Sequence, residues 1–395
     1  MIGARLLAER EGDIVNRATI NHDLLRWARE RRDASFAQIG RSLHVGVDVV
    51  RAWETGESYP SFAKAQALAR FLKIPFGYLF LTKPPSDDIP LPDFRTIGDR
   101  RHGAPSPDFL DLCNQVLLKK EWYREYCEQI SSPPVRFPDR GMNAGIDSLS
   151  EAIGDALSIN AALRRECRDW SSYLTRLSQN AQSIGILVMR SGVVGNDTTR
   201  PLDVAEFRGF AIADAYAPVV FINSRDAIAA QIFTLLHEIA HIWIGQSGVS
   251  NPDPTEFSTN RFEKFCNAVS AQVLVPHEEF ETVWIETPHG DSFLSSIARH
   301  FWVSTLVVLR RAFELNKFGR EEFFRLVKIE KEKQQVRRRT SGGSFSTNLL
   351  ARNSKRFTDG VLRAVRENQL LYRDAANLLG MGPPALSRLV EKYAF

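Results

Sequence analysis

Apolar residues recur at helical spacing along the first eighty residues of the chain. The pattern predicts four short helices between residues 20 and 82. They cover His22–Arg31, Phe36–Leu43, Val47–Glu54 and a segment that begins after Ser61. Ser61 can cap the last of them, since its hydroxyl accepts a hydrogen bond from a free backbone N–H. Short helices joined by tight turns are typical of a helix-turn-helix, and we expect such a domain over 1–82.

The pattern changes twice in the middle of the chain. Residues 83–107 contain six prolines and predict an extended linker. Beyond it, helical and strand-like spacing alternate, which predicts a mainly helical α+β domain over 108–330 with a small β-sheet. The predicted helices cover 108–130, 148–168, 170–183, 226–244, 259–275 and parts of 291–336. The predicted strands are Ile184–Arg190, Phe207–Ala213 and Val219–Asn223.

The end of the chain is predicted to form a separate helical block. Residues 331–344 include three consecutive arginines and a Gly/Ser-rich stretch, which indicates a hinge. The block over 345–395 has the spacing of three or four short helices. Its segments Leu370–Leu379 and Pro384–Tyr393 flank a glycine-rich turn, and this pattern is similar to a second helix-turn-helix. We favour a packing or dimerisation role for this block over contact with DNA.

Composition narrows the class of protein. A net charge of +4 over 395 residues is smaller than that of proteins that coat nucleic acid. The four cysteines are widely scattered, which excludes a zinc-finger framework and a disulfide scaffold and favours free thiols. The N-terminus lacks the apolar run of a signal peptide, and no segment approaches the roughly 20 apolar residues of a membrane helix. We therefore expect a cytoplasmic protein without a membrane partner.

One motif indicates chemistry. His237, Glu238 and His241 form the pattern H-E-x-x-H within the predicted helix over 226–244. Positions i and i+4 share one face of a helix, so both imidazoles can bind the same metal ion while Glu238 acts as a general base. The residues around the motif are apolar, and buried polar groups are costly unless something pairs with them. The pattern predicts a catalytic zinc site, with a pair of ordinary histidines as the alternative.

Two histidines leave the metal short of a third protein ligand. The metzincin pattern fails, because Ile244 stands where that pattern has glycine and no histidine follows in register. A glutamate on a later helix is another common solution, and Glu263 borders the apolar stripe of the helix over 259–275. Spacing alone leaves other candidates open. These are Glu256, Glu278, Asp253 and His277.

The chain resembles the ImmA/IrrE family of metallopeptidases. The matching stretches are Arg208–Phe210, Ala217–Asn223, the helix FTLLHEIAHIW and residues 263–276. The resemblance implies that Glu263 is the third zinc ligand and that the protein cleaves a repressor or similar partner. Two residues depart from the family pattern, namely Cys266 and Gln272, and neither is a predicted metal ligand.

The N-terminal segment resembles Xre-type helix-turn-helix domains. Trp53, Glu54, Gly56 and Pro60 carry this resemblance, which implies DNA binding by the helix over Val47–Glu54. The residues expected on its outer surface are His44, Val47, Asp48, Val50 and Arg51, of which His44, Val47 and Arg51 are the candidate DNA contacts. Asp48 would repel phosphate, and few of these side chains are usual base readers, so a protein-binding or dimerisation surface is the alternative.

Substrate contacts are less clear from the sequence. Strand Val219–Ile222 precedes the motif helix, and an edge strand at this place can pair with an extended peptide, but the residues themselves give little support for this role over a plain core strand. An oxyanion donor is also needed. The candidates are Tyr216, His277, His289 and His300.

The sequence therefore predicts a zinc-dependent regulatory endopeptidase that acts on a specific protein partner. A second hypothesis is a DNA-binding antitoxin or transcription regulator that neutralises a cognate toxin by binding, with the peptidase site secondary. Its partners would be that toxin or repressor and a double-stranded DNA operator, and a homodimer fits either reading. A third hypothesis, a metal-free scaffold, conflicts with the intact motif, because a scaffold does not need Glu238.

Overall fold

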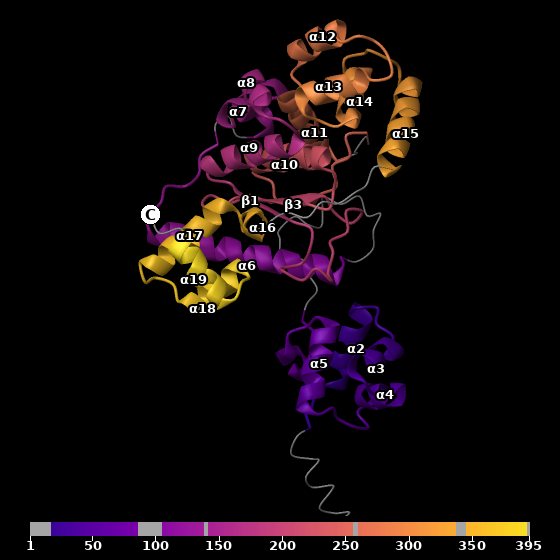
Figure 1. Cartoon of the computed structure of the whole chain (residues 1–395), viewed down its shortest axis with the longest axis vertical. Coiled ribbons are helices and arrows are strands. Elements are labelled where there is room, and N and C mark those ends of the chain that lie inside the picture. The colour runs from indigo at the N-terminus through magenta and orange to yellow at the C-terminus, as the bar shows by residue number, and fades with distance from the viewer. Residues whose placement is uncertain (1–16, 86–104, 138–140, 256–259, 337–344, 393–395) are drawn as a thin grey trace, which may run out of the picture. The chain divides into compact units, whose positions relative to one another are not determined.

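The computed structural model describes residues 17–85, 105–137, 141–255, 260–336 and 345–392 (Figure 1). The chain divides into two compact units, Met1–Asp88 and Ile89–Phe395. Most of the predicted linker and hinge, over 86–104 and 337–344, lies outside the described residues.

The N-terminal unit is a bundle of short helices. They are α2 (His22–Arg31), α3 (Phe36–Leu43), α4 (Val47–Thr55), α5 (Phe62–Leu72) and the 3-10 helix η1 (Phe76–Phe80). Asn21, Ser35 and Ser61 cap α2, α3 and α5, because each side chain accepts a hydrogen bond from a backbone N–H in the first turn. The four predicted helices are therefore confirmed, including the cap at Ser61.

The turn between α3 and α4 brings the two helices close together. His44 ends α3 in the left-handed conformation, with φ of 52°. A Cβ atom at Gly40 would lie 2.9 Å from the carbonyl oxygen of Val45, so glycine is needed where the turn passes over α3. Val50 and Trp53 of α4 then reach the core of the unit.

A mixed four-stranded sheet lies in the second unit. Its strands are β1 (Leu187–Ser191), β2 (Gly209–Ile212), β3 (Val219–Asn223) and β4 (Gly248–Ser250), in the order β1-β3-β2-β4. β3 is parallel to β1 and antiparallel to β2, and β4 is antiparallel to β2. Of the two roles considered for Val219–Ile222, the structure supports the core strand, because β3 is hydrogen-bonded on both sides. The edge strands are β1 and β4, and β4 is too short to give a periodic signal in the sequence.

Helices cover both faces of this sheet. The helices of the second unit are α6 (Pro107–Gln129), η2 (Met142–Ala144), α7 (Ile146–Ala156), α8 (Ala161–Glu166), α9 (Trp170–Ser183), α10 (Ile228–Ile244), α11 (Arg261–Leu274), α12 (His277–Glu286), α13 (Phe293–Phe301), α14 (Thr305–Glu314), α15 (Arg320–Val336), α16 (Phe345–Asn353), α17 (Lys355–Arg366), α18 (Tyr372–Leu379) and α19 (Pro383–Lys392). The helix predicted over 148–168 is two helices, since Ser158 takes a positive φ and Asn160 caps α8. Helix α12 was not predicted.

The two faces of the sheet belong to different cores. On one face, residues such as Val188 and Val220 pack with α7, α9, α10 and α11. On the other, residues such as Met189 and Phe221 pack with α6, α17 and α18. Figure 1 shows β1 and β3 between α9 and α10 on one side and α6 and α17 on the other. The C-terminal helices thus share a core with the sheet, and the predicted mainly helical α+β fold is confirmed.

Two expectations about the whole chain can be compared with the structure. All four cysteines are free, as their scattered positions predicted, and all four are buried. Among the described residues, no helix has both the length and the apolar character needed to cross a membrane.

Candidate metal centre

Helix α10 positions the motif residues in the core. Every residue from Gln231 to Trp243 is buried, because α10 lies between the sheet and helices α9 and α11. Gly245, with φ of 74°, ends the helix in the left-handed conformation that glycine adopts most easily. His237 and His241 are one turn apart and fully buried, with ring centroids 4.8 Å apart.

Helix α11 supplies the third side chain. Asn260 caps α11 by accepting a hydrogen bond from the N–H of Phe262, which places Glu263 in the first turn. A carboxylate is favoured there by the helix dipole. The Oε2 atom of Glu263 lies 3.1 Å from Nε2 of His237, and its Oε1 atom lies 3.2 Å from Nε2 of His241.

The three side chains converge on one point. The two Nε2 atoms of His237 and His241 are 3.0 Å apart, so they form a triangle with the carboxylate of Glu263. Among the described residues, His237, His241 and Glu263 form the cluster of possible ligand side chains that could hold a metal ion. All three are buried, with Glu263 the most accessible at 9% exposed.

Burial and mutual contacts shift the titration of these groups. Burial lowers the pKa of His241, with a smaller opposing effect from Glu263. Burial would raise the pKa of Glu263, but the two imidazoles outweigh it and hold that pKa well below its usual value. The cluster at neutral pH therefore contains an ionised carboxylate and a His241 imidazole with an available nitrogen lone pair, which are the states that bind metals.

Glu238 lies beside the cluster without joining it. It is fully buried, and neither carboxylate oxygen has a hydrogen-bond partner among the described residues. Burial raises the pKa of Glu238 well above its ordinary value, and the nearby charge of Glu263 raises it further. A buried carboxylate without a partner is costly, so its presence requires a functional explanation.

Two neighbours of Glu238 were missed in the sequence. A Cβ atom at Gly209 of β2 would lie 2.9 Å from Oε1 of Glu238 and 2.6 Å from Cγ2 of Thr234. Ser250 of β4 is also buried there, and its hydroxyl lowers the pKa of Glu238 against the effect of burial. Gly209 belongs to a stretch that carried the family resemblance, but nothing in the sequence indicated that its missing side chain makes room for Glu238.

The other candidates for a third ligand are engaged elsewhere or not described. Asp253 accepts a 2.9 Å hydrogen bond from Lys331, and the exposed His277 pairs with Glu281 at 3.7 Å. Glu278 is exposed on α12. Glu256 lies outside the described residues. Among the described candidates, the structure brings only Glu263 to the two histidines.

The candidate oxyanion donors have no recorded contact with the cluster in the described part of the chain. His300 pairs with Glu279 at 3.0 Å, and His289 packs on Phe293 with ring centroids 4.5 Å apart. Tyr216 packs into the core on the α6 face of the sheet, whereas α10 lies on the opposite face. No contact among the described residues therefore identifies one of these candidates as the oxyanion donor.

The outer surface of the helix-turn-helix mostly agrees with the prediction. His44, Val47, Asp48 and Arg51 are exposed on α4 and the turn before it. Val50 was wrongly expected there, because it is fully buried, and Val49 is exposed at 42% instead. Arg51 folds back over the ring of Phe36, with its guanidinium carbon 5.2 Å from the ring centroid.

Comparisons with known families match three parts of the chain. Residues 181–313, which include His237, Glu238, His241 and Glu263, match an IrrE N-terminal-like domain of a peptidase family. Residues 23–75 match a helix-turn-helix domain, and residues 353–392 match a domain of unknown function. No curated protein and no solved structure shows a significant match. The expected combination of an IrrE-type domain with an N-terminal helix-turn-helix is confirmed.

Proposed function

We propose, from the premise that residues 181–313 form an IrrE-type peptidase domain, that this protein is a zinc-dependent regulatory endopeptidase. His237, His241 and Glu263 would hold the zinc, and Glu238 would be the general base. The observation that carries the proposal is a convergent His/His/Glu triangle beside a separate buried glutamate that has no hydrogen-bond partner among the described residues.

The geometry of the triangle supports zinc. Zinc binds histidine nitrogen and carboxylate oxygen at about 2.0–2.2 Å in a tetrahedral arrangement, which separates neighbouring donor atoms by roughly 3.3 Å. The separations here are 3.0, 3.1 and 3.2 Å. The two Nε2 atoms and the two oxygens of Glu263 thus have spacings close to those of ligands that share one zinc ion. Three protein ligands leave a fourth position open, as in catalytic zinc sites.

The chain's own residues would carry the proton transfers. A zinc ion at this site would supply Lewis acidity, polarising a peptide carbonyl and activating water near neutral pH. Glu238 would take the proton of the attacking water at a carboxylate oxygen and pass it to the leaving amine. Its raised pKa suits this role, since a base that holds the proton briefly must be readily protonated. Gly209 leaves the space that the Glu238 carboxylate needs.

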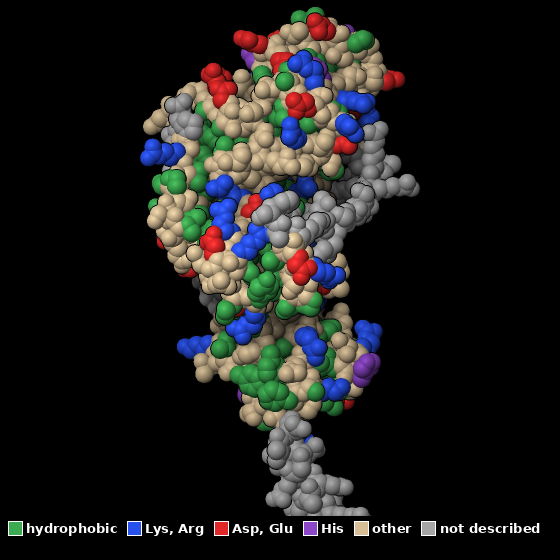
Figure 2. All heavy atoms as spheres, turned by 60° about the vertical axis from the view of Figure 1, so that its left-hand side comes forward, with side chains coloured by type: hydrophobic (Ala, Val, Ile, Leu, Met, Phe, Trp, Pro, Cys, Tyr) green, Lys and Arg blue, Asp and Glu red, His purple; other side chains and the backbone are tan. Residues whose placement is uncertain are grey.

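The protein target is proposed to be a specific partner such as a repressor. The support is the match to an IrrE-type domain together with a helix-turn-helix domain in one chain, an arrangement that joins proteolysis to gene regulation. The second candidate is an antitoxin or transcription regulator that acts by binding. The exposed surface of α4 favours it, because Val47 and Val49 present apolar side chains that suit a protein partner. Figure 2 shows exposed apolar side chains, in green, on the N-terminal unit.

One substitution separates the two candidates. Glu238→Gln should leave zinc bound, since Glu238 is not one of the three converging ligands, and should abolish cleavage because glutamine cannot accept a proton. Loss of a general base lowers rates by about 10²–10⁴-fold. Zinc content by elemental analysis and complementation of a deletion strain would be measured together. A Glu238→Gln protein that retains zinc and complements fully would contradict the peptidase role and support the binding role.

A further inference from the structure

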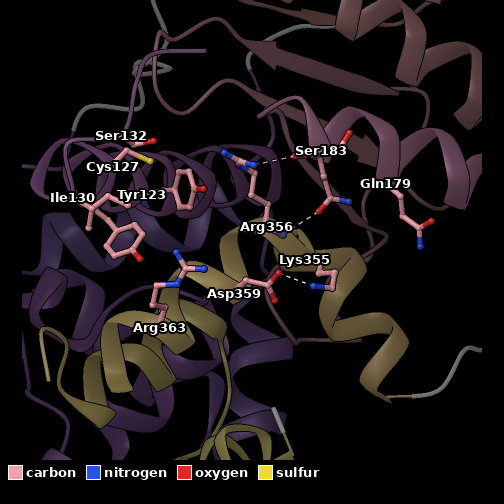
Figure 3. A pocket seen from close by; sticks show the side chains of 13 residues that line it. Tyr123, Cys127, Ile130, Ser132, Gln179, Ser183, Lys355, Arg356, Asp359 and Arg363 are labelled. Atoms are coloured by element: carbon pink, nitrogen blue, oxygen red, sulfur yellow. Dashed lines mark hydrogen bonds and ion pairs between the residues drawn. The ribbon is translucent and has the colours of Figure 1, made fainter. Parts of the chain in front are cut away.

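A cavity of about 400 Å³ lies away from the metal centre, between α6, α9 and α17 (Figure 3). Tyr123 and Tyr126 of α6 line one side, Gln179 and Gln182 of α9 line another, and α17 supplies the third. Its volume is within the range of pockets that bind small molecules. No residue of α10 lines the cavity, and nothing in the proposed peptidase mechanism uses it.

The wall formed by α17 is strongly cationic. Lys355, Arg356 and Arg363 line the cavity from this helix, against the single carboxylate of Asp359. Figure 3 shows these four side chains extending from α17 into the space between α6 and α9. Asp359 pairs with Lys355 at 2.6 Å. Among the described residues, neither Arg356 nor Arg363 forms an ion pair, so the lining carries a net charge of about +2 at neutral pH.

Arg356 is held in place but has unused hydrogen-bonding capacity. Its backbone N–H donates to Oε1 of Gln182 at 3.2 Å, and its Nη1 donates to the carbonyl oxygen of Gln182 at 3.3 Å. Its buried Nε has no hydrogen-bond partner among the described residues. A buried guanidinium N–H without a partner is costly, so its position favours an anionic ligand that the fork of Arg356 can bind.

The α6 side of the cavity combines aromatic rings with neutral hydroxyl groups. Burial raises the pKa of Tyr123 to about 12, so its phenol stays protonated and can donate a hydrogen bond at neutral pH. The buried hydroxyl of Tyr126 has no hydrogen-bond partner in the described part of the chain. The exposed side chain of Ile130 adds an apolar rim. This side suits the apolar or aromatic part of a small molecule.

We propose that this cavity binds a small organic phosphate. Arg356, Arg363 and Lys355 would hold the phosphate, and the apolar part would lie against Tyr123 and Ile130. Charge decides for phosphate over a single carboxylate, because a phosphate monoester carries about −1.5 to −2 near pH 7 and so matches the lining. The proposal does not depend on peptidase activity. It gives a binding role to α17, which lies within the matched domain of unknown function.

The test is isothermal titration of the full chain with phenyl phosphate and with inorganic phosphate. Phenyl phosphate should bind more tightly, because only it fills the aromatic side of the cavity. The double variant Arg356→Gln/Arg363→Gln should lose at least about tenfold in affinity for both, since charge-assisted hydrogen bonds are strong. Arg373→Gln is the matched control, because that side chain is 81% exposed on α18. It should leave binding unchanged.

A second variant guards against misfolding as an explanation. Asp359→Asn removes the one carboxylate of the lining and frees Lys355, so it should bind phenyl phosphate more tightly by about threefold or more. A gain in affinity cannot come from loss of structure. The proposal is overturned if phenyl phosphate does not bind at millimolar concentration, or if Asp359→Asn and the double arginine variant bind like the unmodified chain. Displacement of phenyl phosphate by duplex DNA would instead assign these arginines to nucleic-acid binding.

Discussion

Two buried glutamates in this chain have opposite surroundings. Glu54, in the helix-turn-helix unit, is 5% exposed, and the guanidinium of Arg29 donates to it at 2.7 and 2.8 Å. Glu238, in the peptidase domain, is fully buried, and neither of its oxygens has a partner among the described residues. Both lie on helices that pack against an apolar core. The two glutamates therefore have similar burial, and they differ in whether a cationic side chain pairs with the carboxylate.

The contrast gives a physical criterion for function. A two-point ion pair offsets much of the cost of removing a carboxylate from water, so Glu54 can be explained by stability alone. At Glu238 no cation among the described residues offsets that cost, the charge of Glu263 increases it, and the Ser250 hydroxyl reduces it only in part. Groups that lower the stability of the folded chain and yet remain are expected where chemistry requires them.

The largest expected effect is loss of the metal. In the double variant His237→Ala/His241→Ala, zinc should fall from about one ion per chain to none, because two of the three ligands are gone. Elemental analysis of purified protein measures this. The control is His277→Ala/His289→Ala, which removes two exposed histidines and should leave the zinc in place. Full zinc occupancy in the first variant would contradict the metal centre.

Glu263→Gln tests the third ligand. Glutamine keeps the shape but removes the anionic donor, so zinc affinity should fall by about 100-fold or more, beyond the 10–100-fold typical of residues that support a ligand. Competition with a chelator of known affinity measures the change. Glu278→Gln is the matched control, since Glu278 is exposed on the neighbouring helix α12. Equal affinities in the two variants would show that another group completes the site.

Glu54→Gln should destabilise the N-terminal unit by about 3 kcal/mol. The reason is that the partly buried Arg29 would keep its charge, lose its buried partner Glu54 and retain only the exposed Glu30 at 3.3 Å. Denaturant unfolding followed by the fluorescence of Trp27 and Trp53, both in this unit, detects the change. Glu30→Gln is the control, because its side chain is 61% exposed and should contribute less than about 0.5 kcal/mol. Similar losses of stability in both variants would show that the buried ion pair of Glu54 stabilises the unit no more than an exposed glutamate does.

The sequence predicted helices well and contacts between elements poorly. The metal triangle depends on Glu263, which spacing could not select from other candidates, because it lies 22 positions after His241 on another helix. The family resemblance supplied that choice. Strand β4 and the packing of Gly209 against Glu238 gave no signal, since a three-residue strand has no periodicity and a glycine does not show what fills its space. Val50 was misplaced because V-x-V-V patterns leave the helix phase ambiguous by one residue.

Glu238→Gln should leave the zinc-free protein as stable as the unmodified chain, or more stable. Burial raises the folded pKa of Glu238 above its unfolded value, so the ionised carboxylate opposes folding once the pH exceeds the unfolded pKa. A neutral glutamine removes that penalty at neutral pH. Thermal unfolding after chelator treatment measures it, and the result should be opposite in sign to that of Glu54→Gln. A clear loss of stability would mean that Glu238 has a partner that stabilises the fold.

The smallest expected effects concern the surface of α4 and test what the helix-turn-helix binds. Arg51 and Asp48 are both exposed on this helix, so either can be changed without disturbing the core that Val50 and Trp53 form. If α4 faces an operator, Arg51→Ala should weaken binding by about 1 kcal/mol and reduce the salt dependence by roughly one phosphate contact. Asp48→Ala should strengthen binding by a similar amount, because it removes repulsion from the phosphates.

Gel shifts against the DNA upstream of the protein's own gene, at two salt concentrations, distinguish these outcomes from a protein-binding role. Opposite changes in the two variants require a polyanion at this surface, since loss of folding would weaken binding in both. Arg70→Ala, on α5 outside the α3–α4 surface, is the control for a general effect of positive charge. If no variant binds DNA at low salt, the exposed Val47 and Val49 become the features that matter. The surface would then suit a protein partner, and Asp48→Ala, which removes one charge, would leave binding of that partner almost unaffected.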